Sequence, residues 1–329
     1  MSISKLHTLS AVKIDPDSFS GSAVVLGGIR SQSVFAGTEV RQETTSGSVY
    51  SLWQSVYAGA PGARFGTVAV SSALTAMGTT GLAIAATTGS GLTLFGNKKQ
   101  EGGTRASGSN HISYNIKEGM LLPRRISVDH QGDAVLDVDA IATWDGTNAP
   151  IVSSNAASLP TGITDSERFT IGAVQLGTQA GDKITLAQIQ NIEFDFGITA
   201  TAYASDSDIY PTMVTVDTIE RPMIRITTSD LTQLAGTNGI PLQGKDLASS
   251  HTVIFLRKRA RVTTSGYVAD ATAEHIKIVP LVGCAYHVNI GDYGSSGANG
   301  TATIEIPLVG DGTNAPWAWT MGAAISLPT

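Results

Sequence analysis

The sequence predicts a mainly β protein made of two tandem homologous domains, each a β-sandwich or small barrel with one short flanking helix. Short runs rich in Val, Ile, Thr and Tyr alternate with clusters of Gly, Asn, Asp and Ser, which is typical of strands joined by turns. Helical periodicity is scarce. The hexapeptide Asp-Gly-Thr-Asn-Ala-Pro occupies residues 145–150 and recurs letter for letter at residues 311–316. Such a repeat predicts that one structural unit occurs twice in the chain.

The similarity of the two halves extends beyond the hexapeptide. Residues 156–161 return, with one isoleucine inserted, as residues 323–329. The correspondences keep apolar positions and turn glycines while exposed residues change, as one shared core requires. We therefore expect a tandem duplication with domains at residues 1–161 and 162–329. A shift of about 160 residues brings Val24 onto Ile184, Leu26 onto Leu186, Ile29 onto Ile189, Val34 onto Phe194, Gly37 onto Gly197, Val49 onto Ile209, Tyr50 onto Tyr210 and His111 onto His275.

The expected elements run in the same order in each half. The first half predicts strands at residues 24–26, 65–70 and 126–128, and a helix at residues 71–77 with Ser72 as the candidate N-cap. The second half predicts strands at residues 214–216, 223–226, 253–256 and 276–278, and a helix at residues 228–234. Residues 87–110 and 291–300 are rich in Gly and Ser and are expected to be long loops, which are usually functional or ordered by a partner.

Composition favours a protein that works in contact with others. Only 15% of the 329 residues are charged, below the usual ~25%, so few long solvated side chains protect the surface from association. The net charge of −6 disfavours tight binding of nucleic acid, which needs clustered Lys and Arg. The single cysteine, Cys284, excludes an intramolecular disulfide. We expect no secretory signal and no membrane span, because the longest apolar run, residues 81–86, is too short.

Catalytic signatures are missing from the sequence. There is no phosphate-binding Gly-x-x-x-x-Gly-Lys-Ser/Thr loop, no Gly-x-Ser-x-Gly elbow, no His-Glu-x-x-His pair and no pair of cysteines for zinc. We therefore expect a protein that is not an enzyme and that has no cofactor and no metal site.

One acidic stretch has two interpretations. Asp137 and Asp139 follow Asp129 and Asp133, which could form a carboxylate metal site or an acid–base pair. They also alternate with apolar residues, which places both on the solvated face of one strand. Glu305 occupies a similar outward position in the second half, where most of the other acids are absent. The strand-face interpretation is therefore favoured.

Two further groups are candidates for contacts. The cations Lys98, Lys99 and Arg105 are echoed in the second half by Lys258 and Arg259. We interpret them as partners of an acidic edge on a neighbouring domain or subunit, in preference to a nucleic-acid patch or an unremarkable surface. Trp317 and Trp319 share one face of a strand, where they are either interface anchors or an ordinary core face, the two alternatives being equally weighted.

Several segments resemble the tail structural proteins of long-tailed bacteriophages. The resemblance lies in residues 91–95 (Gly-Leu-Thr-Leu-Phe), residues 101–106 (Glu-Gly-Gly-Thr-Arg-Ala) and residues 127–134 (Ser-Val-Asp-His-Gln-Gly-Asp-Ala). Together with the two β-rich halves, the chain resembles the major tail-tube protein in its duplicated form. These motifs are confined to the first half, whereas the architectural likeness covers the whole chain.

The resemblance implies a structural virion protein in the phage tail, assembled in the host cytoplasm. Tube proteins of the single-domain type form hexameric rings, so a two-domain chain would close as a trimer and the rings would stack into a tube. Partners would be further copies of the chain, the tape-measure, terminator and distal tail proteins, and DNA in transient passage, with no membrane. A bore lined by Asp137, Asp139 and Glu305 would repel phosphate. The alternatives are a capsid decoration protein and a two-domain carbohydrate-binding or adhesive module.

Overall fold

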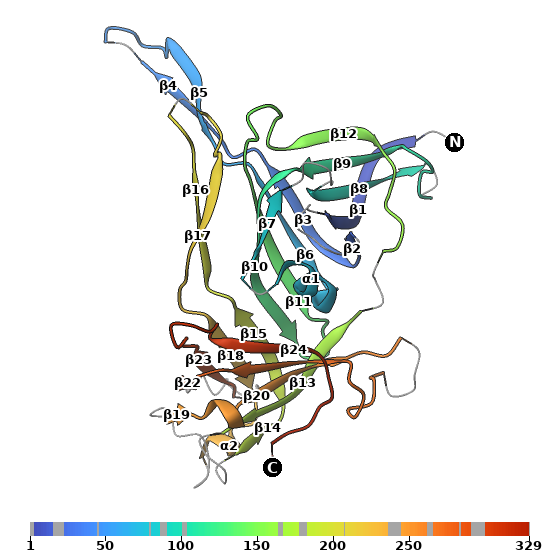
Figure 1. Ribbon diagram of the computed structural model, residues 1–329, viewed down its shortest axis with the longest axis vertical. Coiled ribbons are helices and arrows are strands. Elements are labelled where there is room, and N and C mark those ends of the chain that lie inside the picture. The colour runs from blue at the N-terminus through green and yellow to red at the C-terminus, as the bar shows by residue number, and fades with distance from the viewer. Residues whose placement is uncertain are drawn as a thin grey trace. The chain divides into compact units, whose positions relative to one another are not determined.

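The computed structural model describes residues 3–15, 23–44, 46–78, 80–85, 91–100, 104–163, 167–177, 183–206, 208–235, 245–261, 266–282, 284–290 and 300–328. Most of them lie in antiparallel strands, so the protein is mainly β (Figure 1). The first strands are β1 (Ile3–Asp15), β2 (Val24–Leu26), β3 (Ile29–Phe35), β4 (Thr38–Glu43), β5 (Trp53–Gly59), β6 (Gly62–Thr67), β7 (Leu82–Ala85), β8 (Gly91–Gln100), β9 (His111–Ile116), β10 (Glu118–Asp129), β11 (Val135–Ala142) and β12 (Val152–Ala157).

The remaining strands are β13 (Phe169–Leu176), β14 (Ile184–Leu186), β15 (Ile189–Asp195), β16 (Ile198–Tyr203), β17 (Met213–Ile219), β18 (Met223–Thr228), β19 (Lys245–Leu247), β20 (Val253–Lys258), β21 (His275–Pro280), β22 (Cys284–Ile290), β23 (Ala302–Pro307) and β24 (Trp317–Ala323). The helices are α1 (Val70–Met77), α2 (Thr232–Ala235) and a 3-10 turn at Ser249–His251. None of the described helices is long and apolar enough to cross a membrane.

The chain folds into two compact units that exchange segments of sequence. Unit 1 contains Met1–Pro123, Asp137–Asp165 and Ile198–Thr218, and unit 2 contains Arg124–Leu136, Ser166–Gly197 and Ile219–Thr329. Residues 124–136 of the first half of the chain therefore belong to unit 2. Likewise, residues 198–218 of the second half belong to unit 1.

Unit 1 contains a five-stranded sheet in the order β12-β9-β8-β1-β2 and a second run in the order β7-β10-β11-β6-β3. Its core comes from strand faces with period two, because alternate residues such as Val138, Ala140 and Ala142 along β11 are buried. Helix α1 adds Val70, Ala73, Leu74 and Met77 to this core. It ends at Gly78, whose positive φ of 71° suits glycine, and the Gly78 N–H donates to Leu74 O at 2.8 Å.

Unit 2 contains a five-stranded sheet in the order β24-β21-β20-β13-β14 and a second run in the order β19-β22-β23-β18-β15. Strand β15 also pairs with Arg125–Asp129 of β10. The core gathers Phe169, Phe255, Ile276 and Ile304 from both runs of strands. Ile276 and Ile304 each have a buried residue two positions further along their strand, whereas β20 buries four consecutive residues.

The strands of the two units follow one order. Adding twelve to each strand number of unit 1 reproduces both strand orders of unit 2, and the hairpin β4–β5 becomes the hairpin β16–β17. We call two residues corresponding when they occupy the same place in these two sets of strands. The match includes details of the backbone: Gly37 and Gly197 both have positive φ, and their carbonyls accept the N–H of Ala60 and Glu220 at 3.0 and 2.8 Å.

Some sequence predictions are confirmed and others are wrong. All the predicted short strands are present within or near β2, β6, β10, β17, β18, β20 and β21. The loop predicted at residues 87–110 is wrong for Gly91–Gln100, which forms β8 and buries Leu92, Leu94 and Phe95. The glycines there border a core strand. Residues 87–90, 101–103 and 291–299 lie outside the described residues.

The predicted helix cap at Ser72 and the predicted bounds of the second helix are also wrong. Helix α1 starts one residue earlier than expected, after Ala69, and no side chain caps it, so Ser72 lies inside the helix. The second helix is only Thr232–Ala235, because residues 223–228 continue as β18. The Thr228 side chain instead ties two segments together: its hydroxyl donates to Ala187 O at 2.8 Å and accepts the Asp230 N–H at 3.0 Å.

Candidate self-association surface

Strand β15 has a neighbour on both sides. On one side it pairs with β18, and on the other it pairs with β10, where Ile192 lies opposite Val128 and Phe194 lies opposite Ile126. Beyond the ladder, the Phe196 N–H donates to Arg124 O at 3.1 Å. We call this pairing the β10–β15 junction.

Polar contacts extend the β10–β15 junction into the turn that follows β10. The Ala134 N–H donates to Phe169 O at 2.7 Å, and Asp133 binds Arg168 at 3.0 Å and Arg259 Nε at 3.1 Å. Arg259 Nη2 also donates to the carbonyl of Gln131 at 2.6 Å. Two arginine side chains, of Arg168 and Arg259, and the backbone carbonyl of Phe169 therefore all bind one turn of the first half. Arg259, predicted to meet an acidic edge, lies here beside Asp133.

Strand β3 corresponds to β15 but has one neighbour among the described strands. It pairs with β6 and ends its sheet. Gln32, which corresponds to the buried Ile192, has a buried side-chain oxygen without a hydrogen-bond partner in the described structure. Leaving such an acceptor unpaired is unfavourable. The edge of β3 therefore has the features of a surface that another strand covers.

A cavity of about 760 Å³ opens beside β3 within unit 1. Leu9, Gln32, Ile112 and Tyr114 are among its lining residues, and the Leu9 side chain is 43% exposed. In unit 2 the corresponding strand positions are less exposed. His7 is exposed where it lies opposite Lys98, whereas Phe169, opposite Lys258, is only 2% exposed.

The backbone at the open edge has a defined direction. In an antiparallel sheet, the N–H groups of alternate residues point to the same side. Because the Phe196 N–H points to β10, the N–H groups of Ile192 and Phe194 point there too. The corresponding groups of Gln32, Val34 and Ala36 are therefore directed away from β6, toward the open edge.

The three predicted lumen carboxylates lie on the polar faces of their strands. Asp137 and Asp139 alternate with buried residues of β11, and Asp139 lies 3.3 Å from Arg64. Glu305 on β23 accepts from Arg225 Nε at 3.0 Å and lies 2.6 Å from His287 Nε2. Each polar face thus carries cations beside its acids, which makes the local charge mixed instead of purely acidic.

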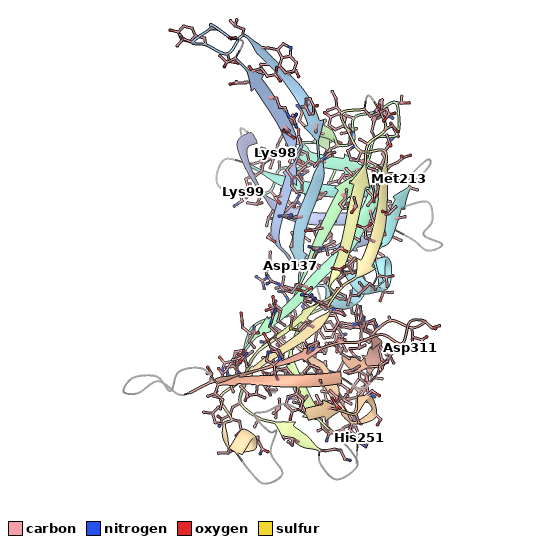
Figure 2. All side chains as sticks on the ribbon, turned by 90° about the vertical axis from the view of Figure 1, so that its left-hand side faces the viewer. Lys98, Lys99, Asp137, Met213, His251 and Asp311 are labelled. Carbon is pink, nitrogen blue, oxygen red and sulfur yellow. The ribbon has the colours of Figure 1, made fainter. Side chains whose placement is uncertain are left out.

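The remaining predicted cations contact residues of their own unit. Lys98 Nζ donates to Asn155 O at 3.1 Å, and Lys258 Nζ pairs with Glu274 at 2.7 Å. Lys99 and Arg105 form an antiparallel bridge with each other's backbone. Within unit 1, Figure 2 shows Lys98 and Lys99 well separated from Asp137. These cations and the carboxylates therefore form no common site within that unit.

Two buried histidines each accept a hydrogen bond from the backbone of a lysine. The backbone N–H of Lys98 donates to His111 Nδ1 at 3.1 Å, and that of Lys258 donates to His275 Nδ1 at 2.9 Å. Both imidazoles are therefore acceptors at Nδ1. Burial, and next the positive charge of Arg105, lower the pKa of His111. The sequence showed the two histidines as a matched pair but gave no sign of this bond.

The two tryptophans belong to an aromatic cluster in unit 2. Trp317 and Trp319 contact Phe194 edge-on, with ring centroids 5.3 and 5.1 Å apart, and Trp319 stacks on Phe196 at 5.8 Å. Trp317 is buried and belongs to the core, whereas Trp319 is half-buried. The Trp317 indole does not offer an exposed platform for a sugar ring.

Sequence reasoning missed the residues that distinguish the two edges. His7, Leu9 and Gln32 carry no motif, and their importance appears only beside the buried Phe169 and Ile192. The alignment of the two halves contains a signal for Gln32, since a polar residue there faces an isoleucine in the second half.

Neither a protein-family model nor a curated protein sequence matches the chain. Among the described residues, no group of three or more His, Cys, Asp or Glu side chains is placed to hold a metal ion.

Proposed function

We propose that the chain is a tandem duplication of one β-sandwich unit and that copies of it assemble head to tail into closed rings. The observation that carries the proposal is the contrast between β15, which β10 covers, and β3, which borders an open cavity. A second copy would supply the missing neighbour by repeating the β10–β15 junction between chains.

The strand that would cover β3 is the one that corresponds to β10, namely β22 of another copy. Gly300 corresponds to Ala134, so its N–H would donate to the carbonyl of His7. This contact copies a hydrogen bond of the β10–β15 junction, at 2.7 Å.

A contact of this kind joins two different surfaces, and repeating it either closes a ring or grows an open filament. Closure leaves no sheet edge exposed, which protects a β protein from uncontrolled aggregation. Each chain contributes two sandwiches, so three chains would give a ring of six. This arrangement agrees with the resemblance of the sequence to duplicated tail-tube proteins.

The function we propose is therefore a structural one, in the tail tube of a bacteriophage. Stacked rings would enclose a channel through which DNA passes, with tape-measure, terminator and distal tail proteins as further partners. Asp137, Asp139 and Glu305 are candidates for the channel wall. Their pairing with Arg64 and Arg225 supports a wall of mixed charge, which would hold phosphate weakly and let DNA slide.

The test is the oligomeric state of the purified chain, read by native mass spectrometry and negative-stain microscopy. We expect trimers and annular particles that stack into tubes of uniform width. Leu9→Lys should abolish them, because a charge would enter the cavity that the neighbour fills. Val152→Lys is the matched control, since Val152 is also a strand residue with 43% exposure but lies outside that cavity.

Three outcomes separate the alternatives. Trimeric rings that never stack would favour a capsid decoration protein over a tube. A chain that stays monomeric at every concentration would overturn the proposal altogether. Equal assembly of Leu9→Lys and Val152→Lys would show that the β3 edge is not the contact.

A further inference from the structure

The hairpin β16–β17 packs its tip against the body of unit 1. The Gly59 N–H donates to Ile209 O at 2.8 Å, and the Trp144 N–H donates to Pro211 O at 2.8 Å. Between these two bonds, Tyr210 packs against Gly59, where an added Cβ would lie 2.6 Å from the tyrosine ring. We call Ile209, Tyr210 and Pro211 the docked tip.

The docked tip covers a strip just before the first hexapeptide turn. Thr143 in this strip is only 6% exposed. In unit 2 the corresponding strip, before the second hexapeptide, consists of Val309 and Gly310. Val309 is 53% exposed there. The same place in the fold is thus covered in one unit and open in the other.

The hairpin β4–β5 corresponds to β16–β17 residue for residue. In β16–β17 the Thr212 N–H donates to Tyr203 O at 2.8 Å, and in β4–β5 the Leu52 N–H donates to Glu43 O at 3.1 Å. Tyr50 corresponds to Tyr210, yet 79% of it is exposed. We call Val49, Tyr50 and Ser51 the free tip.

The free tip has no cover within its own chain among the described residues. Every residue of β4 is exposed, and Figure 1 shows β4–β5 projecting from the sheets of unit 1. Figure 2 shows its side chains standing clear on both faces. Val49, Leu52, Trp53 and Tyr57 are exposed apolar or aromatic residues there. A two-stranded hairpin alone is marginal in water, and an apolar one calls for a partner.

We propose that the free tip of one copy docks on Val309 and Gly310 of a second copy, as the docked tip does on Thr143 and Trp144 within one chain. This inference rests on the head-to-tail assembly proposed above. The Gly310 N–H donates to the carbonyl of Ser51, and Tyr50 takes the place of Tyr210. The partner surface is therefore a defined strip of this same chain.

The place that Tyr50 would occupy on the second copy differs from the pocket that Tyr210 lines. Tyr210 lines a pocket of about 240 Å³ in unit 1, together with Val34, Ala36, Ile151 and Ser153. In unit 2 the corresponding residues are Phe194, Phe196, Trp317 and Trp319, whose rings fill this space by packing on one another. Tyr50 of the first copy would therefore pack on this aromatic cluster of the second copy, in which Trp319 is half-buried, instead of lining a pocket.

Disulfide trapping tests this contact directly. In a Cys284→Ser background, Ser51→Cys and Gly310→Cys are combined in one chain and oxidised. Backbone groups that share a hydrogen bond across strands place their Cα atoms within the ~4.4–6.8 Å that a disulfide spans. We expect covalent dimers and trimers on non-reducing gels, whereas each single variant should give dimers at most.

The chain provides its own positive control. Trp144→Cys with Pro211→Cys reproduces the docked tip, and should form a disulfide inside one chain without multimers. Native mass spectrometry of the same samples reports assembly independently of trapping. As a second variant, Tyr50→Ala should weaken association ~30-fold, as loss of an aromatic hot spot does.

Each outcome decides the inference. Covalent trimers together with weakened assembly of Tyr50→Ala support it. Rings that form without trapping between Ser51→Cys and Gly310→Cys overturn the docking of the free tip and leave the ring proposal standing. Absence of any oligomer overturns both.

Discussion

Strand β3 in unit 1 and strand β15 in unit 2 occupy the same place in the strand order, but their surroundings differ. β15 lies between two strands and buries Ile189, Ile192 and Phe194, whereas β3 has β6 on one side and leaves its other side open. Their registers even shift at the same point, near Ile29 and Ile189. The two strands therefore share their backbone pairing on one side and differ in the neighbour on the other side.

The largest expected effect is a difference in stability between alanine substitutions at Phe169 and at His7, which occupy corresponding positions. Phe169→Ala should lower the free energy of unfolding by about 3–5 kcal/mol, because a fully buried ring is lost from a closed core. His7→Ala, at the corresponding exposed position, should change it by less than ~0.5 kcal/mol. Urea denaturation of both variants in the Leu9→Lys background measures this without assembly. Equal losses would contradict an open first edge.

A second pair should behave alike. Gly37 and Gly197 have φ of 56° and 61°, and a Cβ at either would collide with a backbone carbonyl, of Ala60 and of Glu220 respectively. Gly37→Ala and Gly197→Ala should each destabilise by about 2 kcal/mol or more. Thermal unfolding of the two variants gives the comparison. Tolerance at one glycine only would mean that the two strand corners are built differently.

The buried histidine of unit 1 should make stability depend on pH. Because the folded-state pKa of His111 is lowered, the unfolded chain binds a proton more readily, and stability falls as the pH drops below about 6.5. His111→Gln should remove part of this slope. Denaturation at pH 7.5 and pH 5.5 measures it. A wild-type slope of opposite sign would show that His111 is protonated in the fold.

The smallest expected effects concern the two hexapeptide turns. Asp145 and Asp311 each accept two backbone N–H groups and a side-chain amide of the turn, with identical distances of 2.8, 2.6 and 2.8 Å. These bonds lower the pKa of both carboxyls to about 2. Their contribution should be present above pH ~4 and lost as the pH falls through 2.

Single variants test the equality of these turns. Asp145→Asn and Asp311→Asn should shift the thermal midpoint slightly and by the same amount, read by circular dichroism at pH 7. Asp311 is exposed and Asp145 is partly exposed, so solvent screens the effect. Unequal shifts would separate the two turns despite their identical sequence.

Local patterns in the sequence predicted much of the fold. Alternation placed Leu136 and Val138 in the core and Asp137 and Asp139 on the other face of β11, and the strand positions follow from β-branched runs. The sequence also shows that Tyr50 corresponds to Tyr210, because both hairpins have the same length.

The sequence gives no comparable indication of which distant strands pair. Nothing near Arg125 indicates that β10 pairs with β15, and the grip of Arg259 on Asp133 joins residues far apart in the chain. β8 was missed because its flanking glycines and lysines resemble a loop, although Leu92 and Leu94 face the core. The sequence indicated the cations and the tryptophans as contact residues. Their partners depend on long-range contacts that the sequence pattern does not indicate.

The β10–β15 junction also bears on how quickly copies of the chain could join. In a ring of three, half of the sheet junctions exist before any two molecules meet. Three bodies lose their translational freedom instead of six, so the rate of ring formation should rise with a lower power of concentration. Fusing two units in one polypeptide would then let tubes grow from scarcer material than separate units need.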